Sequence, residues 1–309
     1  MGSDPTRPAM CTAGRSLRSR GQLTLQLTSK AKSGDTIPIY STERQVKTEA
    51  FFDLNPVFSL EQAARAFGQQ NHRSTVERLR YHVSTGRLKA VARGIYAPVP
   101  PGVTPGRFRP DAFLVAAAVR PDAVLSHHSA FELLGAAHSV WNVVTVQTAS
   151  RRKSLRLEVG RIDFLAHPAV LARSRRTELG VRSVDRAGQT LRLTGPERTL
   201  VDSFRNPAHS GGVSELVESA AGLAVLDLEL LWRVLAAYGE KGLFAAVGWF
   251  LERQQRALFV PDEFLRRLEE HRPKSPHYLL RGERGGRLAR RWNLILPDVL
   301  VQPGEPDER

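Results

Sequence analysis

Near the front of the chain, apolar residues recur with the spacing of two short amphipathic helices. The first helix is predicted to begin at the capping box Ser59–Gln62 and to end at Gly68. A second capping box, Ser74–Glu77, begins another helix after a short turn. Each helix carries one apolar stripe, made of Leu60, Ala63, Ala64 and Phe67 in the first and of Val76, Leu79 and Val83 in the second. This arrangement predicts a helix-turn-helix.

The pattern changes to a two-residue period directly after the second helix. Leu88, Ala90 and Ala92 alternate with Lys89, Val91 and Arg93, and Gly94 stands where a hairpin tip is needed. Two strands joined by a tight turn are typical of the wing of a DNA-binding domain. The sequence therefore predicts a winged helix-turn-helix over residues 51–99.

The rest of the chain divides into a linker, a mixed region and a tail. The linker is predicted at residues 100–106, where proline and glycine break regular structure. Beyond it, residues 107–309 are expected to form a mixed α/β (α+β) domain, and residues 1–50, which show no period, a disordered basic tail. Strands are expected at 142–148, 161–167 and 190–193, with an edge strand at 293–296. Helices are expected at 111–120, 127–135, 196–205, 213–221, 226–238, 243–255 and 261–271.

Composition narrows the partners and the compartment. The 45 Lys and Arg against 31 Asp and Glu leave a formal net charge of +14, which favours a polyanion, nucleic acid before an anionic membrane surface. The single Cys11 excludes a disulfide framework. The longest apolar run, residues 112–119, is shorter than the ~20 residues that cross a bilayer, and no secretory signal opens the chain. We expect a soluble, cytoplasmic protein with no membrane partner.

The predicted DNA-binding residues lie on the second helix and the wing. Residues 51–99 contain seven cations and three acids, a net charge of +4 on a small module. Arg side chains and hydroxyl groups on a recognition helix read base edges, and cations of a wing contact phosphates. These roles are assigned to Arg73, Ser74, Glu77, Arg78, Tyr81, Arg87, Lys89 and Arg93. The alternative is a helical subdomain with a solvated Arg face, or a winged helix reused for protein contact.

Three blocks of the sequence resemble a known family. Residues 79–97 look like the winged helix of AbiEi-type antitoxins, in which a "G-x-L … x-R-G-x-Y" wing follows the recognition helix. Residues 126–135 are similar to the family's "S-x-x-S-A-L-x-L-x-G" helix, and residues 195–202 to its "x-P-E-R-T-L-x-D" segment. Their order and spacing match over roughly residues 55–300. The Arg-rich head before Phe51 departs from the family pattern, and the last helices match it less clearly.

The resemblance implies an antitoxin of a type IV, AbiE-type toxin-antitoxin system. Such proteins repress their own operon by binding inverted repeats in the promoter through the winged helix. Their C-terminal domain opposes a nucleotidyltransferase-like toxin without forming a stable complex. The resemblance also points to Glu197, Arg198 and Asp202 as an antitoxin surface. The purely structural alternative for Arg198 and Asp202 is a surface ion pair of ~0.5 kcal/mol or less.

Other chemistries find little support in the sequence. Adjacent His127 and His128 do not share a helix face, so no metal site is expected there, and N-terminal capping by Ser126 explains the block. Asp163 lies on a predicted strand, but no Glu-x-Lys follows as a restriction-type nuclease would need. Phosphate-binding and nucleophile-elbow motifs are missing as well. We expect no catalytic residues and no cofactor.

Two other functional classes stay open. The chain could be a winged-helix transcriptional regulator of other genes whose α/β domain senses a ligand or partner, with helices 226–238 and 243–255 walling a pocket. A nucleic-acid-processing enzyme is the second alternative.

Overall fold

The structure, a computed structural model, describes residues 39–68, 72–280, 282 and 285–301. Residues 43–309 form one compact unit. Most of the expected tail, including Cys11, lies outside the described residues. Residues 39–50 differ from that expectation because they belong to helix α1 (Ile39–Leu54). The end of α1 is anchored by Phe51 and Phe52, whose rings lie 4.9 and 5.6 Å from that of Phe58.

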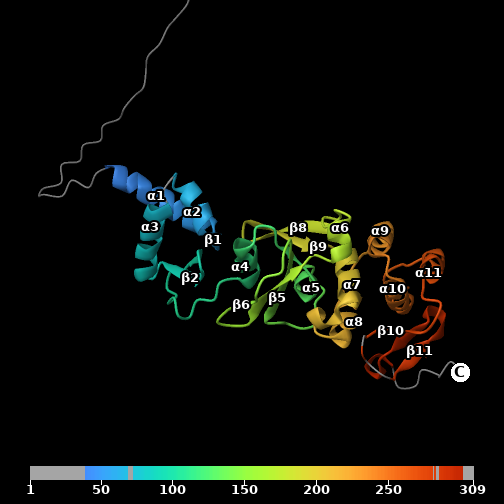
Figure 1. Cartoon of the computed structure of the whole chain (residues 1–309). Coiled ribbons are helices and arrows are strands. Elements are labelled where there is room, and N and C mark those ends of the chain that lie inside the picture. The colour runs from blue at the N-terminus through green and yellow to red at the C-terminus, as the bar shows by residue number, and fades with distance from the viewer. Residues whose placement is uncertain (1–38, 69–71, 281, 283–284, 302–309) are drawn as a thin grey trace, which may run out of the picture. The chain divides into compact units, whose positions relative to one another are not determined.

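A front module, defined here as residues 58–98, holds two helices and a small antiparallel sheet (Figure 1). The capping box at Ser59 is confirmed: its hydroxyl accepts from the Gln62 amide, and the Gln62 side chain accepts from the Ser59 amide. The second helix begins at His72, so Ser74 lies inside it and is not its N-cap. The elements are β1 (Phe58–Ser59), α2 (Leu60–Ala66), α3 (His72–Ser84), β2 (Leu88–Ala92) and β3 (Ile95–Pro98), with strand order β1-β3-β2.

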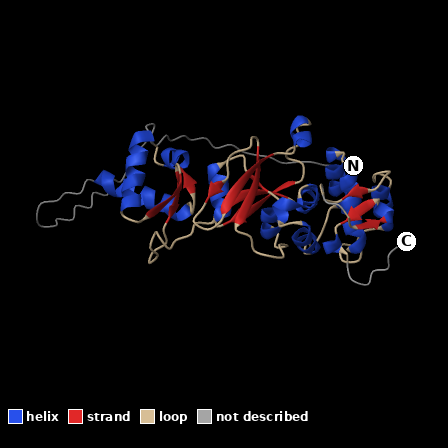
Figure 2. Ribbon diagram, turned by 60° about the horizontal axis from the view of Figure 1, so that its bottom comes forward, coloured by secondary structure: helices blue, strands red, loops and turns tan. Residues whose placement is uncertain are grey.

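A six-stranded mixed sheet forms the centre of the α/β region (Figure 2). Its order is β6-β7-β5-β4-β9-β8, with parallel pairs β5–β7 and β4–β9 and antiparallel pairs elsewhere. The three strands expected from the sequence are confirmed as β5 (Val143–Thr148), β7 (Arg161–Ala166) and β9 (Gln189–Thr194). The remaining strands are β4 (Val124–Leu125), β6 (Leu155–Arg156) and β8 (Val181–Arg186).

Helices cover both faces of this sheet. Helix α4 (Ala112–Val119) packs on the apolar face, where Val144 and Ile162 are buried. The opposite face carries α5 (His128–Leu133) and α7 (Pro196–Arg205). Along β5 and β7, apolar residues such as Val144 and Ile162 therefore alternate with polar ones such as Thr145 and Asp163, which separates an apolar side of the sheet from a polar one.

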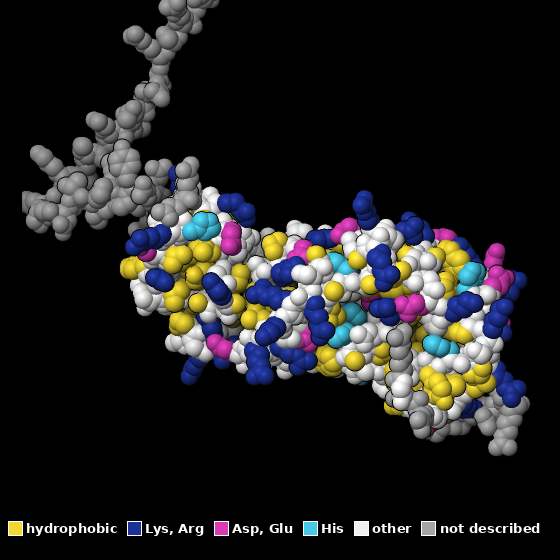
Figure 3. Space-filling view, viewed as in Figure 1, with side chains coloured by type: hydrophobic (Ala, Val, Ile, Leu, Met, Phe, Trp, Pro, Cys, Tyr) yellow, Lys and Arg dark blue, Asp and Glu magenta, His cyan; other side chains and the backbone are white. Residues whose placement is uncertain are grey.

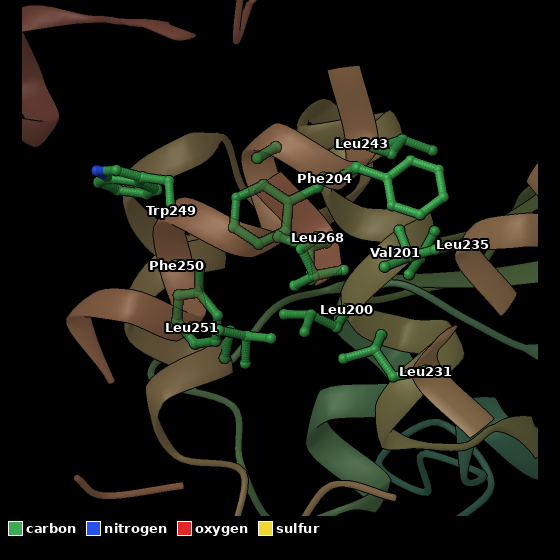
Figure 4. Close-up of a cluster of buried hydrophobic side chains, with 14 of the residues drawn as sticks. Leu200, Val201, Phe204, Leu231, Leu235, Leu243, Trp249, Phe250, Leu251 and Leu268 are labelled. Atoms are coloured by element: carbon green, nitrogen blue, oxygen red, sulfur yellow. The ribbon is translucent and has the colours of Figure 1, made fainter. Parts of the chain in front are cut away.

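The C-terminal part is a helical layer followed by a small sheet. The helices are α6 (Ala169–Arg173), α8 (Val213–Ala221), α9 (Leu228–Tyr238), α10 (Lys241–Arg253) and α11 (Asp262–Glu269), with 3-10 turns η1 (Pro207–Ser210), η2 (Arg290–Trp292) and η3 (Asp298–Leu300). Figure 4 shows Leu200 of α7, Leu231 of α9 and Phe250 of α10 in one apolar cluster. At the end of this layer, Trp292 is fully buried against Gly248 of α10.

The last strands differ from the sequence prediction in one respect. The strand expected at 293–296 is present as β12 (Leu294–Leu296), but it is the central strand of a sheet. It pairs in parallel with β10 (His277–Tyr278) and antiparallel with β11 (Arg287–Ala289). The flanking strands β10 and β11 are short and carry no clear two-residue pattern, so the sequence did not predict them. Because of them, β12 is a central strand and not an edge strand.

An apolar cluster joins the front module to the central sheet. Val57, Ile95 and Ala97 are buried together with Phe113 and Leu114 of α4. The segment expected as a linker, residues 100–106, connects β3 to α4 by turns. The residues before this segment and those after it therefore belong to one shared apolar core. Among the described residues, no helix is long and apolar enough to cross a bilayer.

Candidate functional site

One side of α3 is open to solvent along its whole length. The side chain of Arg73 is 86% exposed, that of Glu77 62%, and Tyr81 is 64% exposed. Arg80 and Ser84 are exposed as well, and the spacing of these residues follows a helical stripe. The stripe, which we call the α3 face, consists of Arg73, Glu77, Arg80, Tyr81 and Ser84.

The opposite side of α3 fixes this orientation. Leu79 is completely buried among Phe52, Phe58, Ala63 and Leu88. Leu79 lies between Arg78 and Arg80 in sequence, about 100° from each around the helix, so the contact of Arg78 with Phe67 decides which of the two arginines faces outward. Arg80 lies on the α3 face, whereas Arg78 is half-buried with its guanidinium 4.9 Å from the centre of the Phe67 ring. The sequence assigned DNA reading to Arg78 and omitted Arg80.

The remaining predicted residues of α3 divide between the stripe and its margin. Ser74 is half-buried at the margin. Arg73 Nε lies 3.4 Å from Glu77 Oε1, one helical turn away on the α3 face. An exposed pair of this kind contributes little to stability, so both groups can exchange it for another partner at small cost.

The hairpin that follows α3 presents a single cation at its tip. Arg93 is exposed, and the next residue, Gly94, has a φ of 73°, a conformation that a side chain would strain. The Leu60 amide donates to the Gly94 carbonyl at 2.8 Å, which ties the tip to α2. A groove of about 750 Å³ beside the tip brings Arg93 together with Arg65 and Arg192.

The other two hairpin cations are held by internal acids. Lys89 Nζ lies 2.5 Å from Glu158 Oε1 and donates to the Phe108 carbonyl at 2.7 Å, and the Lys89 side chain is only 13% exposed. The hydrogen bond from Lys89 lowers the pKa of Glu158. Arg87 Nη1 lies 3.1 Å from Glu49 Oε1. Lys89 therefore faces the sheet region, in contrast to the exposed phosphate contact expected from the alternating pattern.

The expected antitoxin surface on α7 is wrong, because its three residues are buried. Glu197 and Arg198 have no exposed surface, and Asp202 is 2% exposed. Helix α7 lies between β5, which contributes Gln147, and α9, which contributes Tyr238. A helix covered on both sides must satisfy its polar groups internally. These residues hold the fold together and cannot form a contact surface.

Arg198 is the centre of this buried network. Its Nη2 donates to Gln147 Oε1 at 2.7 Å, its Nη1 donates to the carbonyls of Leu179 and Thr177, and its Nε donates to Asp202 Oδ2. Asp202 also accepts from the Tyr238 hydroxyl. Burial, together with the neighbouring carboxylate, raises the pKa of Tyr238 well above its usual value. The network joins the sheet to the helical layer.

The two adjacent histidines, His127 and His128, lie in different environments. His128 Nδ1 lies 2.9 Å from Glu132 Oε1, and His128 Nε2 lies 3.2 Å from Glu215 Oε1. His127 occupies the N-cap of α5 in place of the expected Ser126, with no side-chain cap. Burial lowers the pKa of His127 to about 4. Within the described part of the chain, no three His, Cys, Asp or Glu residues are grouped as metal ligands.

Comparison with known proteins supports the fold. No protein family model matches the sequence, and no curated protein matches it. The structure is similar to the crystal structure of the RV2827C protein from Mycobacterium tuberculosis, with a TM-score of 0.54 and 18% sequence identity. The match covers 84% of this chain and 92% of that chain. The two proteins share a mixed α/β fold.

Proposed function

We propose that the protein binds double-stranded DNA through its front module, acting as a winged helix-turn-helix. In this proposal α3 enters the major groove as the recognition helix, and the β2–β3 hairpin is the wing that contacts the adjacent backbone. The observation that carries the proposal is the α3 face, which stays exposed while the other side of the same helix is core. It favours entry of α3 into a groove.

The chemistry of the α3 face suits base reading. Arg73 and Arg80 offer forked donors for guanine, and the Glu77 carboxylate can accept from cytosine. Tyr81 offers a hydroxyl and an aromatic face beside them. The stripe spans eleven residue steps, or roughly 16 Å of helix, which is comparable to the ~12 Å width of the major groove. At the hairpin tip, Arg93 is placed to reach a phosphate.

We further propose that the protein is an AbiEi-type antitoxin and autorepressor of a type IV toxin-antitoxin system in the cytoplasm. The support is the sequence resemblance, whose three blocks fall on α3 to β3, on α5 with its flanking residues, and on α7. The protein would bind inverted repeats in its own promoter and oppose a nucleotidyltransferase-like toxin without a stable complex. Because α7 is buried, the neutralising contacts lie outside Glu197, Arg198 and Asp202.

A mobility-shift titration of the full chain on the DNA upstream of its own gene tests the DNA-binding proposal. The control is a duplex of the same length and composition in scrambled order. We expect retardation of the upstream duplex at lower protein concentration than the scrambled one. Equal retardation of both duplexes would contradict reading of base sequence.

Co-expression tests the antitoxin proposal separately. The full chain, driven by a foreign promoter, is expressed with a nucleotidyltransferase encoded beside its gene, and growth is measured. We expect rescue by the wild type and also by an Arg80→Ala/Tyr81→Ala variant, since repression is not needed from that promoter. Absence of rescue by the folded wild type would contradict the antitoxin role and favour a regulator of other genes.

A further inference from the structure

A second concentration of positive charge lies at the edge of the central sheet, away from the front module. It is a concave groove of about 610 Å³ beside β7, floored by Phe164 and Leu165. We call it the basic groove, after its four cations, which are Arg151, Arg152, Lys153 and Arg161. In Figure 3, dark blue Lys and Arg side chains gather over the part of the molecule where Figure 1 labels β5 and β6.

The sheet topology brings these cations together. The chain leaves β5 at Thr148 and turns back into β6, which pairs antiparallel with β7. The start of this loop is fixed, because the Ala149 amide donates to Asp122 Oδ2 at 2.8 Å and the Thr148 hydroxyl donates to the Ser150 carbonyl at 2.7 Å. Residues 151–153 therefore follow a held backbone along β7.

The groove is strongly positive. Its four cations face one acid, Asp163, which leaves a formal charge of +3. Asp163 is occupied by Arg161, whose Nε lies 3.0 Å from Oδ1. Within the described residues, Arg151 and Lys153 have no acidic partner, so their charges face solvent.

His209 of η1 closes one side of the groove and responds to its field. Burial lowers the pKa of His209, and the guanidinium groups of Arg151 and Arg161 lower it further, while Asp163 opposes them. The imidazole is therefore kept neutral beside the cations and can serve as a hydrogen-bond donor to an anionic oxygen.

Arg152 adds a feature that a simple anion site does not need. Its guanidinium lies 5.7 Å from the centre of the buried Phe164 ring. A guanidinium held over an aromatic ring leaves its other face available for stacking on an unpaired base. Single-stranded nucleic acid is bound by cations that lie beside a planar group. The phosphate backbone follows the cations while the bases stack on the planar group.

We infer that the basic groove binds single-stranded nucleic acid by its phosphodiester backbone. A hollow of this kind fits one strand, with its phosphates against the cations and an unpaired base against Arg152, whereas the bases of a duplex are paired and cannot stack there. The site is distinct from the α3 face, because it is built on β7 and the loop between β5 and β6. The inference therefore stands or falls independently of the DNA-binding function proposed for the front module.

The experiment compares two charge-matched variants of the full chain. Arg151→Gln/Arg152→Gln/Lys153→Gln removes three cations of the groove. The control, Arg173→Gln/Arg175→Gln/Arg176→Gln, removes three exposed cations at the end of α6 and after it. Fluorescence anisotropy measures binding of labelled single-stranded RNA and DNA of about 12 nucleotides, a length within the range of known single-strand sites, and of a duplex. Thermal unfolding followed by circular dichroism checks that both variants fold.

We expect the groove variant to bind both single strands about tenfold more weakly, with the slope of log affinity against log salt reduced by about 2, or ~0.7 for each lost phosphate contact. Its duplex affinity should equal that of the control variant, which keeps wild-type single-strand binding. A preference for RNA over DNA would add ribose contacts to the same site. Three results would each overturn the inference: no single-strand binding by the wild type at low salt, an equal loss in the control, or an equal loss for duplex.

Discussion

Lys89 Nζ and Glu158 Oε1 lie 2.5 Å apart, although the two residues belong to different hairpins. Lys89 is on β2 of the front module, and Glu158 is in the turn between β6 and β7 of the central sheet. Arg109 also pairs with Glu158. One carboxylate therefore anchors the front hairpin and the segment after it to the sheet, which removes Lys89 from the set of cations available to DNA.

Lys89 and Arg93 should behave differently in salt titrations of duplex binding. Arg93→Gln is expected to reduce the slope of log affinity against log salt by about 0.9, as for one lost phosphate contact. Lys89→Gln should leave the slope unchanged, because Lys89 already pairs with Glu158. Anisotropy titrations at several salt concentrations measure both. A reduced slope in Lys89→Gln would show that the pair opens on DNA.

Arg80→Ala is predicted to weaken binding to the operator by ~1 to 3 kcal/mol, the value of a bidentate contact to a base. The reason is the position of Arg80 at the middle of the α3 face. Arg233→Ala, which removes an exposed arginine from α9, is the control and should have no effect. Titrations on specific and scrambled duplexes decide the outcome. An equal loss on both duplexes would show that Arg80 contacts a phosphate and does not read a base.

Removal of Arg198 should destabilise the fold strongly. Arg198→Met leaves the Asp202 carboxylate buried without its cation, and breaking a buried pair in this way costs ~3 to 5 kcal/mol. Arg173→Met, at an exposed position of α6, should change the free energy of unfolding by ~0.5 kcal/mol or less. Urea unfolding measures both. The double variant Arg198→Met/Asp202→Asn should recover part of the loss; no recovery would show that the carboxylate is not the source of the cost.

His127 should make the protein less stable in mild acid. The pKa of His127 is lowered to about 4 by burial, from an ordinary value of 6.5. Between these values the unfolded chain binds a proton that the folded chain does not, so the free energy of unfolding falls as pH falls through this window. From pH 7 to pH 5 the His127 contribution should be a loss of about 2 kcal/mol.

Urea unfolding of the wild type and His127→Asn at both pH values tests this prediction. Burial also lowers the pKa of His167 and His209, and both remain in the variant, so the difference between the two proteins isolates His127. We expect the smaller pH dependence in the variant. The same dependence in both proteins would contradict a neutral, buried His127.

Gly248→Ala should destabilise the protein even though alanine is the better helix former. An added Cβ would lie 2.1 Å from Cζ3 of the buried Trp292 indole, a distance that forces the ring to move. Overpacking of this kind costs ~1 to 3 kcal/mol, which offsets the ~1 kcal/mol gained in helix propensity. Gly106→Ala, where an added Cβ meets nothing within 4 Å, is the control. A higher melting temperature for Gly248→Ala would contradict the close contact.

Local patterns were sufficient where neighbours in sequence decide the structure. The capping box at Ser59, the hairpin tip at Gly94 and strand β7 all follow from short-range signals. The polar stripe of α3 was also visible, but Arg78 and Arg80 flank Leu79 symmetrically around the helix, so only the tertiary contact of Arg78 with Phe67 separates them.

Tertiary contacts decided the residues that were predicted wrongly. Glu197, Arg198 and Asp202 share one side of α7, which in isolation indicates a solvated face. The structure covers that side with Gln147 and Tyr238, from positions 51 and 36 residues away in the chain. Thr194 beside this helix is also used internally, because its hydroxyl bonds to that of Thr199 and Gly195 is the N-cap.

The apolar seam of Val57, Ile95 and Ala97 against α4 limits how this protein can be redesigned. A chimera that moved the front module onto another protein would expose this seam, because that protein would lack the surface of α4 that covers it. The front module therefore cannot be exchanged as a separate unit. New operator preferences are better sought by replacing residues of the α3 face one at a time, which leaves the shared core untouched.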